Sequence, residues 1–518
     1  VNHLAKLSPS ELKTQTSAGA PAAPAIAMRR LTHSQYNHTV RDLLGDQTNP
    51  ADQFPQEDFV NGFKNQVEAQ GIPPLLQESY SASAEKLARN AFRMGDKSAL
   101  LGCAPRSVGD AECRDKFLRR FGLRTFRRPL TDVELARYSE LFRAEAKRTG
   151  RFSAGAQLIV EAMLQSPKFL FRIENTADPK WRQYETASRL SYLLWDSMPD
   201  DRLFEAAAAG RLETPAQIDQ AARRLIADKR AHQALDEFVA EWLRFDRLLN
   251  TVKDRQLFPV YTPELGISMV EETRRLIQDT VWNNGNFMRI FDADYAFLSS
   301  DLASLYKLPA PPTEFAKVPL PPETERAGIV GEATFLALTS KPGDTSPTAR
   351  GLFVREQFLC QHVPDPPPGV NANLPPLTPD KPMTNRDRLG VHLSRESCAS
   401  CHKLMDPIGF GLEKFDAIGV HRDVFEIVFR PGHGEKRQNP RRCRCPSILP
   451  AISPGFPILT STRPGSWDVC WPTAPCAPNA WSSNFSATPT GVGRRPATGP
   501  RSRRRSKGSG VHSFIIRS

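Results

Sequence analysis

The sequence predicts an all-α protein made of several consecutive helical domains. From about residue 80 to residue 250, apolar residues recur at helical spacing in one segment after another. Helix-start signals precede several of these segments. In Thr131-Asp-Val-Glu134, for example, the threonine and the glutamate can satisfy the free N–H groups of a first turn. Strand patterns are few throughout. The length of 518 residues exceeds a single core, so more than one domain is expected.

The helices can be placed in order along the chain. The first is expected from Leu31 to Gly45, with Thr32 as its N-cap and the glycine as its stop. It carries His33 and His38, for which a solvent-facing or hydrogen-bonded structural role is the commoner outcome. Residues 46–75 are expected to form a loop, and residues 309–322 a linker. The other helices are expected at 131–142, 157–165, 186–195, from 198 onward, 214–242, from 262 onward, 295–308, 328–338, 347–360 and from 384 onward.

These elements divide the chain into successive units. Helical domains are expected at 29–95, 96–175, 176–310 and 323–382, and the last ends in a proline-rich extended boundary at 364–382. A small helical segment follows at 383–425. Residues 1–28 are interpreted as a linker or a truncated N-terminus, and 426–518 as a basic, proline-rich tail. Within 96–175, Cys103 and Cys113 either form a disulfide or remain two unpaired cysteines.

The positive charge of the chain is concentrated in its tail. The formal net charge is +12, and residues 431–518 alone, with 14 Lys and Arg against 2 Asp and Glu, account for all of it. A nucleic-acid partner would depend on this tail, and none is expected for the neutral body. The tail is either a disordered basic segment or, as we prefer, a translation in the wrong reading frame. Back-translation of residues 466–493 in a shifted frame permits a peptide with helical apolar spacing.

One short stretch, Cys398-Ala-Ser-Cys401-His402, indicates a chemistry. Two cysteines three positions apart, with a histidine directly after the second, are the attachment signature of haem c. The sulfurs would form thioethers to the porphyrin vinyl groups, and His402 would be the proximal iron ligand. The sequence therefore predicts covalent haem c and electron transfer. Residues 406–411, which contain Asp406-Pro407 and two glycines, are expected to form a tight loop against the ring edge.

The sixth ligand of the iron is left open by the sequence. Met383, His392 and His421 are candidates, and an open or water-bound iron is an equal alternative. Met405 lies three residues after His402, on the same side of the ring, and cannot easily reach the opposite face. The identity of this ligand decides between electron transfer and small-molecule chemistry.

Other uses of these cysteines are alternatives. Cys360 and His362 could hold a structural zinc ion together with Cys398 and Cys401, although the spacing of the first pair is poor. A thioredoxin-like redox pair lacks the surrounding βαβ pattern, and a reduced pair without a cofactor is the simplest alternative. Elsewhere no Ser/His/Asp set, phosphate-binding glycine loop or paired carboxylate stands out, so no catalytic residue is assigned.

The compartment follows from the haem prediction, because covalent haem is attached outside the cytoplasm in bacteria. The sequence contains no window of 18 apolar residues and no signal peptide within residues 1–30. We therefore expect either that the N-terminus lies upstream of Val1, with an export signal there, or that the cysteines serve another purpose.

Six segments occur in a specific order along the chain. They are RLTHSQYNHTVRDLLG at 30–45, FLRRFGLRTFRRPLTD at 117–132, AMLQSPKFLFR at 162–172, RLSYLLWDSMPD at 189–200, SPTARG at 346–351 and the stretch 398–419. This ordered set resembles large bacterial proteins assembled from planctomycete-type domains of unknown function together with planctomycete-type cytochrome c domains. The resemblance covers residues 29 to 422.

The resemblance implies an exported protein, periplasmic or extracellular, that holds haem c in the segment 383–425 and works with an electron donor or acceptor protein. It implies no known reaction, and the substrate of any larger oxidoreductase system is unidentified. Such proteins often carry a further CxxCH segment upstream and end in an arginine- and aromatic-rich helix, and this chain has neither. The competing interpretation is a non-catalytic helical binding scaffold of the cell envelope, with a polysaccharide partner and a vestigial haem or a structural zinc site.

Overall fold

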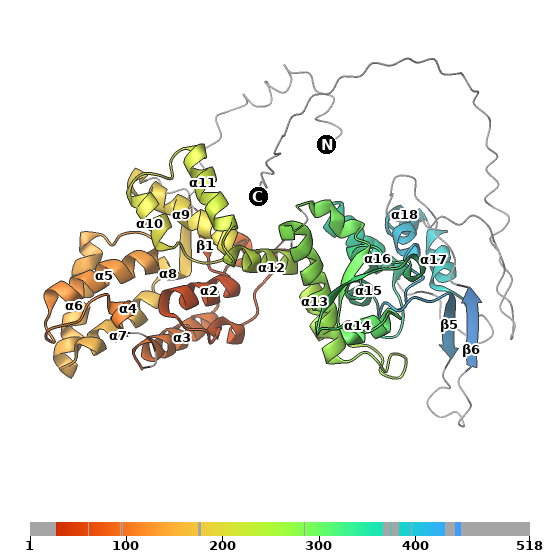
Figure 1. Cartoon of the computed structure of the whole chain (residues 1–518), viewed down its shortest axis with the longest axis horizontal. Helices are drawn as coiled ribbons and strands as arrows, with labels where there is room; N and C mark the ends of the chain where they lie inside the picture. The colour runs from red at the N-terminus through yellow and green to blue at the C-terminus, as the bar shows by residue number, and fades with distance from the viewer. Residues whose placement is uncertain are drawn as a thin grey trace, which may run out of the picture.

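The structure, a computed structural model, describes residues 27–429 and 441–446, apart from 61, 94, 96, 175–177, 284, 366–373, 375–382 and 395. Over these residues it is largely helical, and its sheets are three antiparallel pairs of strands. The predicted all-α class is confirmed. Figure 1 shows two groups of helices, an N-terminal lobe with α2 to α11 and a C-terminal lobe with α13 to α18, joined by α12 (Arg230–Leu243).

The N-terminal lobe confirms the predicted helix starts. The side chains of Thr32, Thr131 and Thr214 each cap a helix in a capping box, and the first helix ends at Gly45 with φ of 75°. The helices are α2 (His33–Leu44), α3 (Pro74–Arg93), α4 (Lys97–Leu101), α5 (Ala111–Phe126), α6 (Asp132–Thr149), α7 (Phe152–Leu164), α8 (Pro167–Leu170), α9 (Pro179–Trp195), α10 (Asp201–Ala208) and α11 (Pro215–Ile226).

A short sheet ties the start of the described chain to the end of α8. Strand β1 (Ala27–Arg30) pairs antiparallel with β2 (Phe171–Glu174), and the N–H of Leu31 extends the pairing by donating to the carbonyl of Leu170 at 2.8 Å. The expected linker 1–28 thus gives way to strand structure at residue 27. Four residues carry too little alternation for either strand to be recognised in the sequence.

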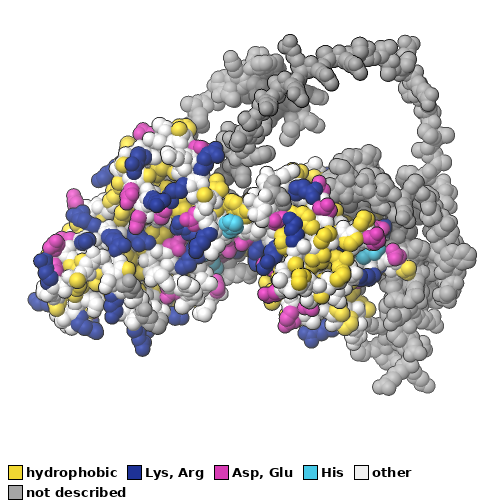
Figure 2. All heavy atoms as spheres, viewed as in Figure 1, with side chains coloured by type: hydrophobic (Ala, Val, Ile, Leu, Met, Phe, Trp, Pro, Cys, Tyr) yellow, Lys and Arg dark blue, Asp and Glu magenta, His cyan; other side chains and the backbone are white. Residues whose placement is uncertain are grey.

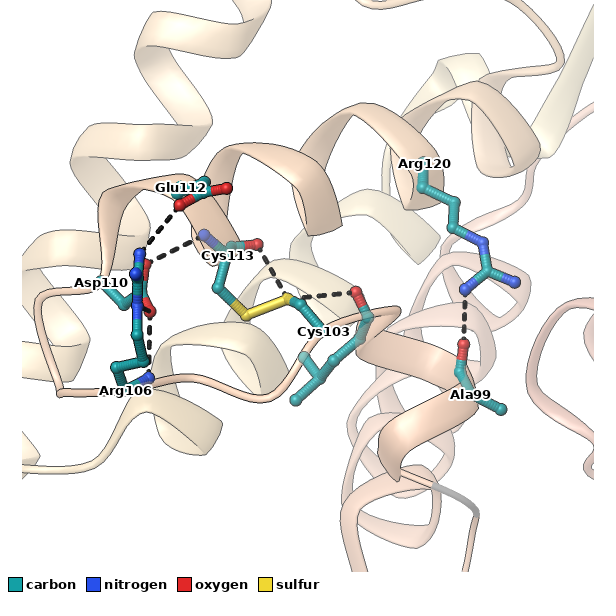
Figure 3. Close-up of a disulfide and its surroundings, with 8 residues drawn as sticks. Ala99, Cys103, Arg106, Asp110, Glu112, Cys113 and Arg120 are labelled. Carbon is teal, nitrogen blue, oxygen red and sulfur yellow. Dashed lines mark hydrogen bonds and ion pairs between the residues drawn. A yellow bond between two sulfur atoms is a disulfide. The ribbon is translucent and has the colours of Figure 1, made fainter.

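Cys103 and Cys113 form a disulfide, with Cα atoms 5.7 Å apart. Figure 3 shows the bond at the start of α5, where the carboxylate of Asp110 accepts a hydrogen bond from the N–H of Cys113 at 3.1 Å. Arg106 forms ion pairs with both Asp110 and Glu112. The loop is thereby fastened to the helix that follows it, and of the two sequence alternatives the disulfide is confirmed.

The C-terminal lobe is arranged around α13, whose predicted N-cap, Thr262, accepts a hydrogen bond from the N–H of Leu265 at 3.2 Å. Its helices are α13 (Pro263–Gln278), α14 (Ser300–Leu305), α15 (Ala333–Leu338), α16 (Pro347–Phe353), α17 (Asn385–Leu393) and α18 (Glu396–Phe410). Its strands are β3 (Tyr295–Leu298), β4 (Ala316–Pro319), β5 (Val424–Phe429) and β6 (Arg441–Pro446).

Several local predictions were wrong. The linker expected at 309–322 contains strand β4, which pairs with residues 295–298. Residues 295–298 form strand β3, paired with β4, rather than the start of a helix, and alternate side chains of β3 are buried as the period of a strand requires. The helix expected over 214–242 is interrupted at 227–229, where the side chain of Asp228 accepts a hydrogen bond from the N–H of Arg230 at 3.0 Å. Residues 406–410 continue α18 through Pro407 instead of forming a tight loop.

The two lobes have separate cores that meet at α12. Ala231, near its start, packs with residues of α9 to α11, whereas Val239 and Leu243, near its end, belong to the core of the C-terminal lobe. That second core extends as far as Ile418. On the face seen in Figure 2, basic and acidic side chains are intermingled and hydrophobic side chains gather on the C-terminal lobe. No described helix could cross a membrane.

Several sequence predictions fall on undescribed parts of the chain. Residues 1–26, nearly all of the proline-rich stretch 364–382 and most of the tail lie outside the described residues. Within the expected tail, β6 is described as a strand paired with β5. The reading-frame interpretation and the domain limits stay predictions.

Candidate functional site

The CxxCH residues lie on α18. Cys401 and His402 follow Cys398 by three and four residues, which places each of them next to Cys398 on the surface of a helix. Neither cysteine forms a disulfide within the described chain. Cys398 is buried, while Cys401 and His402 are partly exposed. The helix therefore brings two thiols and an imidazole together, with Cys401 and His402 partly exposed and Cys398 buried beside them.

The imidazole of His402 is held by a buried carboxylate one turn further along the helix. Nδ1 of His402 lies 2.9 Å from Oδ2 of Asp406, whose side chain is completely buried. This hydrogen bond raises the pKa of His402. Because an ionised carboxylate only accepts hydrogen bonds, the neutral ring carries its proton on Nδ1, and Nε2 is the nitrogen suited to bind a metal. The donor set fits a haem c iron.

Helix α16, formed by the SPTARG segment, holds the chain that follows α18. Arg350 is fully buried and donates to the carbonyl oxygens of Leu412 (2.7 Å), Phe415 (2.9 Å) and Asp416 (2.7 Å). Burial lowers the pKa of Arg350 to about 10, which leaves it charged at neutral pH. In the sequence, SPTARG serves only as part of the family resemblance. In the structure, its Arg350 fixes the turn after the CxxCH helix.

The two helices are in backbone contact through glycines. A Cβ atom on Gly351 of α16 would overlap the backbone of Met405, and one on Gly409 of α18 would overlap the backbone of Pro347. Thr348 of α16 also donates a hydrogen bond to Oδ1 of Asp406 at 2.7 Å. The support of the site therefore comes from α16 as well as from α18.

The candidates for the sixth iron ligand have different surroundings. Met383 is partly buried just before α17, and the side chain of His392 lies outside the described residues. His421 forms a β-bridge with Phe415 and packs edge-on against its ring, with centroids 5.6 Å apart. Burial lowers the pKa of His421. None of these contacts involves His402, so the sixth ligand stays a prediction.

The zinc alternative finds no support in the described part of the chain. Cys360 and His362 are exposed, and the imidazole of His362 lies 3.7 Å from a carboxylate oxygen of Glu356. No group of three or more His, Cys, Asp or Glu side chains among the described residues is arranged to hold a metal ion. The four proposed zinc ligands are therefore not assembled here.

A group of titratable side chains that the sequence does not reveal lies where α2 meets α9 and α12. Nδ1 of His38 is 3.2 Å from Oδ2 of Asp196, and Nδ1 of His33 is 3.8 Å from Oε2 of Glu57. Burial lowers the pKa of His33 to about 4, whereas for His38 the hydrogen bond with Asp196 outweighs burial and raises the pKa. The ring of His38 is hydrogen-bonded, as a structural role requires, whereas Nε2 of His33 is buried with no hydrogen-bond partner among the described residues. His38 and Asp196 are 158 positions apart in the chain, so this pair cannot be recognised in the sequence.

Four family models match successive parts of the chain, each described as a protein of unknown function: PSD3 (DUF1587) at 29–93, PSD5 (DUF1595) at 113–174, PSD4 (DUF1592) at 182–308 and PSCyt3 (DUF1588) at 326–424. The last is a cytochrome c-type domain family, and its match includes both α16 and the CxxCH helix. No curated protein and no solved structure matches the chain. The chain belongs to the bacterial multidomain proteins of planctomycete-type domains of unknown function that include a planctomycete-type cytochrome c domain.

Proposed function

We propose that this protein is an exported haem c protein that transfers electrons, as one component of an oxidoreductase system. The observation that carries the proposal is the face of α18, where two thiols stand beside an imidazole whose Nδ1 is occupied by a buried carboxylate. Cys398 and Cys401 would hold the haem covalently, and Nε2 of His402 would bind the iron. Haem bound there supplies a one-electron redox centre.

The location we propose is the periplasm or the extracellular space. The disulfide between Cys103 and Cys113 supports it, because disulfides persist in oxidising compartments. Attachment of haem outside the cytoplasm agrees with this location. The partner we propose is an electron donor or acceptor protein, and the partial exposure of Cys401 and His402 would let such a protein approach the site.

The test is to export the full chain in a bacterium that attaches haem c, and to measure haem on the denatured protein by staining and by its reduced absorption spectrum. We expect one covalent haem in the wild-type protein and none in the Cys398→Ala/Cys401→Ala variant. Cys360→Ala, which changes an exposed cysteine of the same lobe, should keep the haem. A wild-type protein without covalent haem would overturn the proposal.

A second candidate, a non-catalytic binding scaffold of the cell envelope, is favoured by one surface. The rings of Phe63, Phe238, Trp242 and Phe287 follow one another with centroid separations of 5.9, 6.1 and 6.1 Å. Phe238 is 45% exposed and Phe287 39% exposed. Exposed aromatic side chains are enriched at binding surfaces, and their flat faces suit the rings of a polysaccharide. A wild-type protein without covalent haem would favour this scaffold, since a scaffold needs no haem.

A further inference from the structure

We infer that Asp406 and Thr348 are positioning residues for His402: Asp406 sets the orientation and basicity of the imidazole, and Thr348 moderates the effect of Asp406. For the iron, the inference rests on the proposed haem function. For the imidazole itself, it holds whether or not haem is attached.

The hydrogen bond between His402 and Asp406 is built into the helix. The two residues are one turn apart on α18, and their ring nitrogen and carboxylate oxygen are 2.9 Å apart. The carboxylate is completely buried, so solvent screens its effect on the imidazole less than it would at the surface. This geometry fixes the ring orientation and keeps the proton on Nδ1.

A hydrogen bond from Nδ1–H to a carboxylate makes the opposite nitrogen of the ring a stronger donor to a metal. A stronger axial donor stabilises the oxidised iron relative to the reduced iron, and the axial ligand with its hydrogen bonds is a main determinant of haem potential. Asp406 is therefore expected to lower the reduction potential of the bound haem.

Thr348 acts on the other oxygen of the same carboxylate. Its hydroxyl donates to Oδ1 of Asp406 at 2.7 Å, and so competes with His402 for the negative charge. Thr348 belongs to α16, which the Arg350 contacts and the glycine contacts fix against α18. Helix α16 thereby acts on the proposed iron ligand through a single carboxylate.

Substitutions at Asp406 and Thr348 should shift the reduction potential in opposite directions. This distinguishes an effect on the iron ligand from a purely structural contact between the helices. Asp406→Asn replaces the carboxylate by a weaker acceptor, so the haem should become about ten-fold easier to reduce, which is about 59 mV for one electron. Thr348→Val removes the competing hydrogen bond, so Asp406 interacts more strongly with His402 and the reduction potential should fall. The control is Thr345→Val, which removes a similar threonine–carboxylate hydrogen bond, to Glu413 at 2.8 Å, and should leave the potential unchanged.

The potentials are measured by spectroelectrochemical titration of the exported holoprotein. If Asp406→Asn and Thr348→Val shift the potential in the same direction, or if neither shifts it beyond the control, the tuning role is wrong. Equal haem content in all variants, measured by absorption, ensures that the comparison concerns the same species.

A measurement without haem separates this inference from the proposed function. In the unexported apoprotein with 15N-labelled histidine, at a pH above the titration of the ring, we expect His402 to carry its proton on Nδ1. Asp406→Asn should move it toward Nε2. A wild-type ring protonated on Nε2 would overturn the inference even if haem is bound. Loss of haem attachment with the Nδ1 proton retained would reject the proposed function alone.

Discussion

Glu241 illustrates how a single side chain responds to its surroundings. It projects from α12, and its Oε2 accepts a hydrogen bond from the backbone N–H of Lys64 at 3.2 Å. Burial is the largest influence on this carboxyl group and raises its pKa from 4.5 to about 7, against the opposing effect of that hydrogen bond. Folding therefore favours the protonated form of Glu241, and its contribution to stability depends on pH.

We expect the contribution of Glu241 to be fully present below pH 4.5 and to be lost as the pH rises through about 7. Over this interval the folded state holds a proton that the unfolded state has released, so the free energy of unfolding falls with rising pH. Glu241→Gln should remove this part of the pH dependence, which amounts to at most about 3 kcal/mol.

The measurement is denaturant unfolding at about pH 5 and about pH 8, chosen to bracket the expected titration. Glu213→Gln, at an exposed carboxyl group, is the control and should leave the pH dependence as in the wild type. An unchanged pH dependence in Glu241→Gln would contradict the assignment.

Sequence reasoning finds side chains whose partners are near in the chain. Cys398, Cys401 and His402 can be recognised because their spacing is itself the signal, and Cys103 and Cys113 because they are only 10 residues apart. Arg350 and Asp406 could not be assigned roles. The carbonyl groups after α18 that Arg350 contacts lie 62 to 66 residues away, and backbone carbonyls have no sequence signature. The threonine that reaches Asp406 lies 58 residues before it.

Between elements, the close contact of α16 and α18 depends on two glycines. The backbones approach so closely that Gly351 and Gly409 have no room for a side chain. Gly266 in α13 offers a matched comparison, because a Cβ atom there would meet only the hydroxyl of Tyr261, at 3.8 Å. All three are within helices, so helix propensity favours alanine equally at each.

Gly351→Ala and Gly409→Ala should each destabilise the C-terminal lobe by about 1–3 kcal/mol or more, because the added methyl group forces the helices apart. Gly266→Ala should instead stabilise the protein by about 0.5–1 kcal/mol, since it only reduces the freedom of the unfolded chain. Urea unfolding of the three variants tests this. Equal changes in the free energy of unfolding for Gly351→Ala and Gly266→Ala would show that the contact between α16 and α18 is not the cause of the destabilisation.

Helix starts are predictable and short strands are not. The caps at Thr32, Thr131, Thr214 and Thr262 are local, since a side-chain oxygen meets an N–H group three residues on. The strand at 295–298, in contrast, cannot be recognised in the sequence because four residues show no clear period, and it is pairing with 316–319 that makes it a strand.

At the scale of the whole molecule, the described residues form a pair of lobes whose cores meet within α12. One core is formed from residues 31 to 204, with a smaller neighbour that ends at Ala231, and the other from residues 239 to 418. The Cys103–Cys113 disulfide lies in the first lobe, and the CxxCH helix in the second. The two lobes should therefore respond separately to changes made in one of them.

We expect calorimetry to resolve two unfolding transitions, and Cys103→Ala/Cys113→Ala to lower only the one that belongs to the N-terminal lobe. A disulfide that closes a loop of this length contributes about 3 kcal/mol by constraining the unfolded chain. Cys360→Ala, in the other lobe, should leave that transition in place. A single transition that the disulfide variant shifts as a whole would contradict independent lobes.

The buried guanidinium of Arg350 also bears on how such a chain can be recombined during evolution. Its acceptors belong to the turn after α18, and a charge left inside a core without its acceptors costs several kcal/mol. A gene fusion that joined a foreign CxxCH helix at the prolines between α16 and α17 would leave the buried Arg350 without these carbonyl acceptors. The unit that can be inherited or exchanged intact therefore includes α16, although the haem-attachment motif itself begins 52 residues after Ser346.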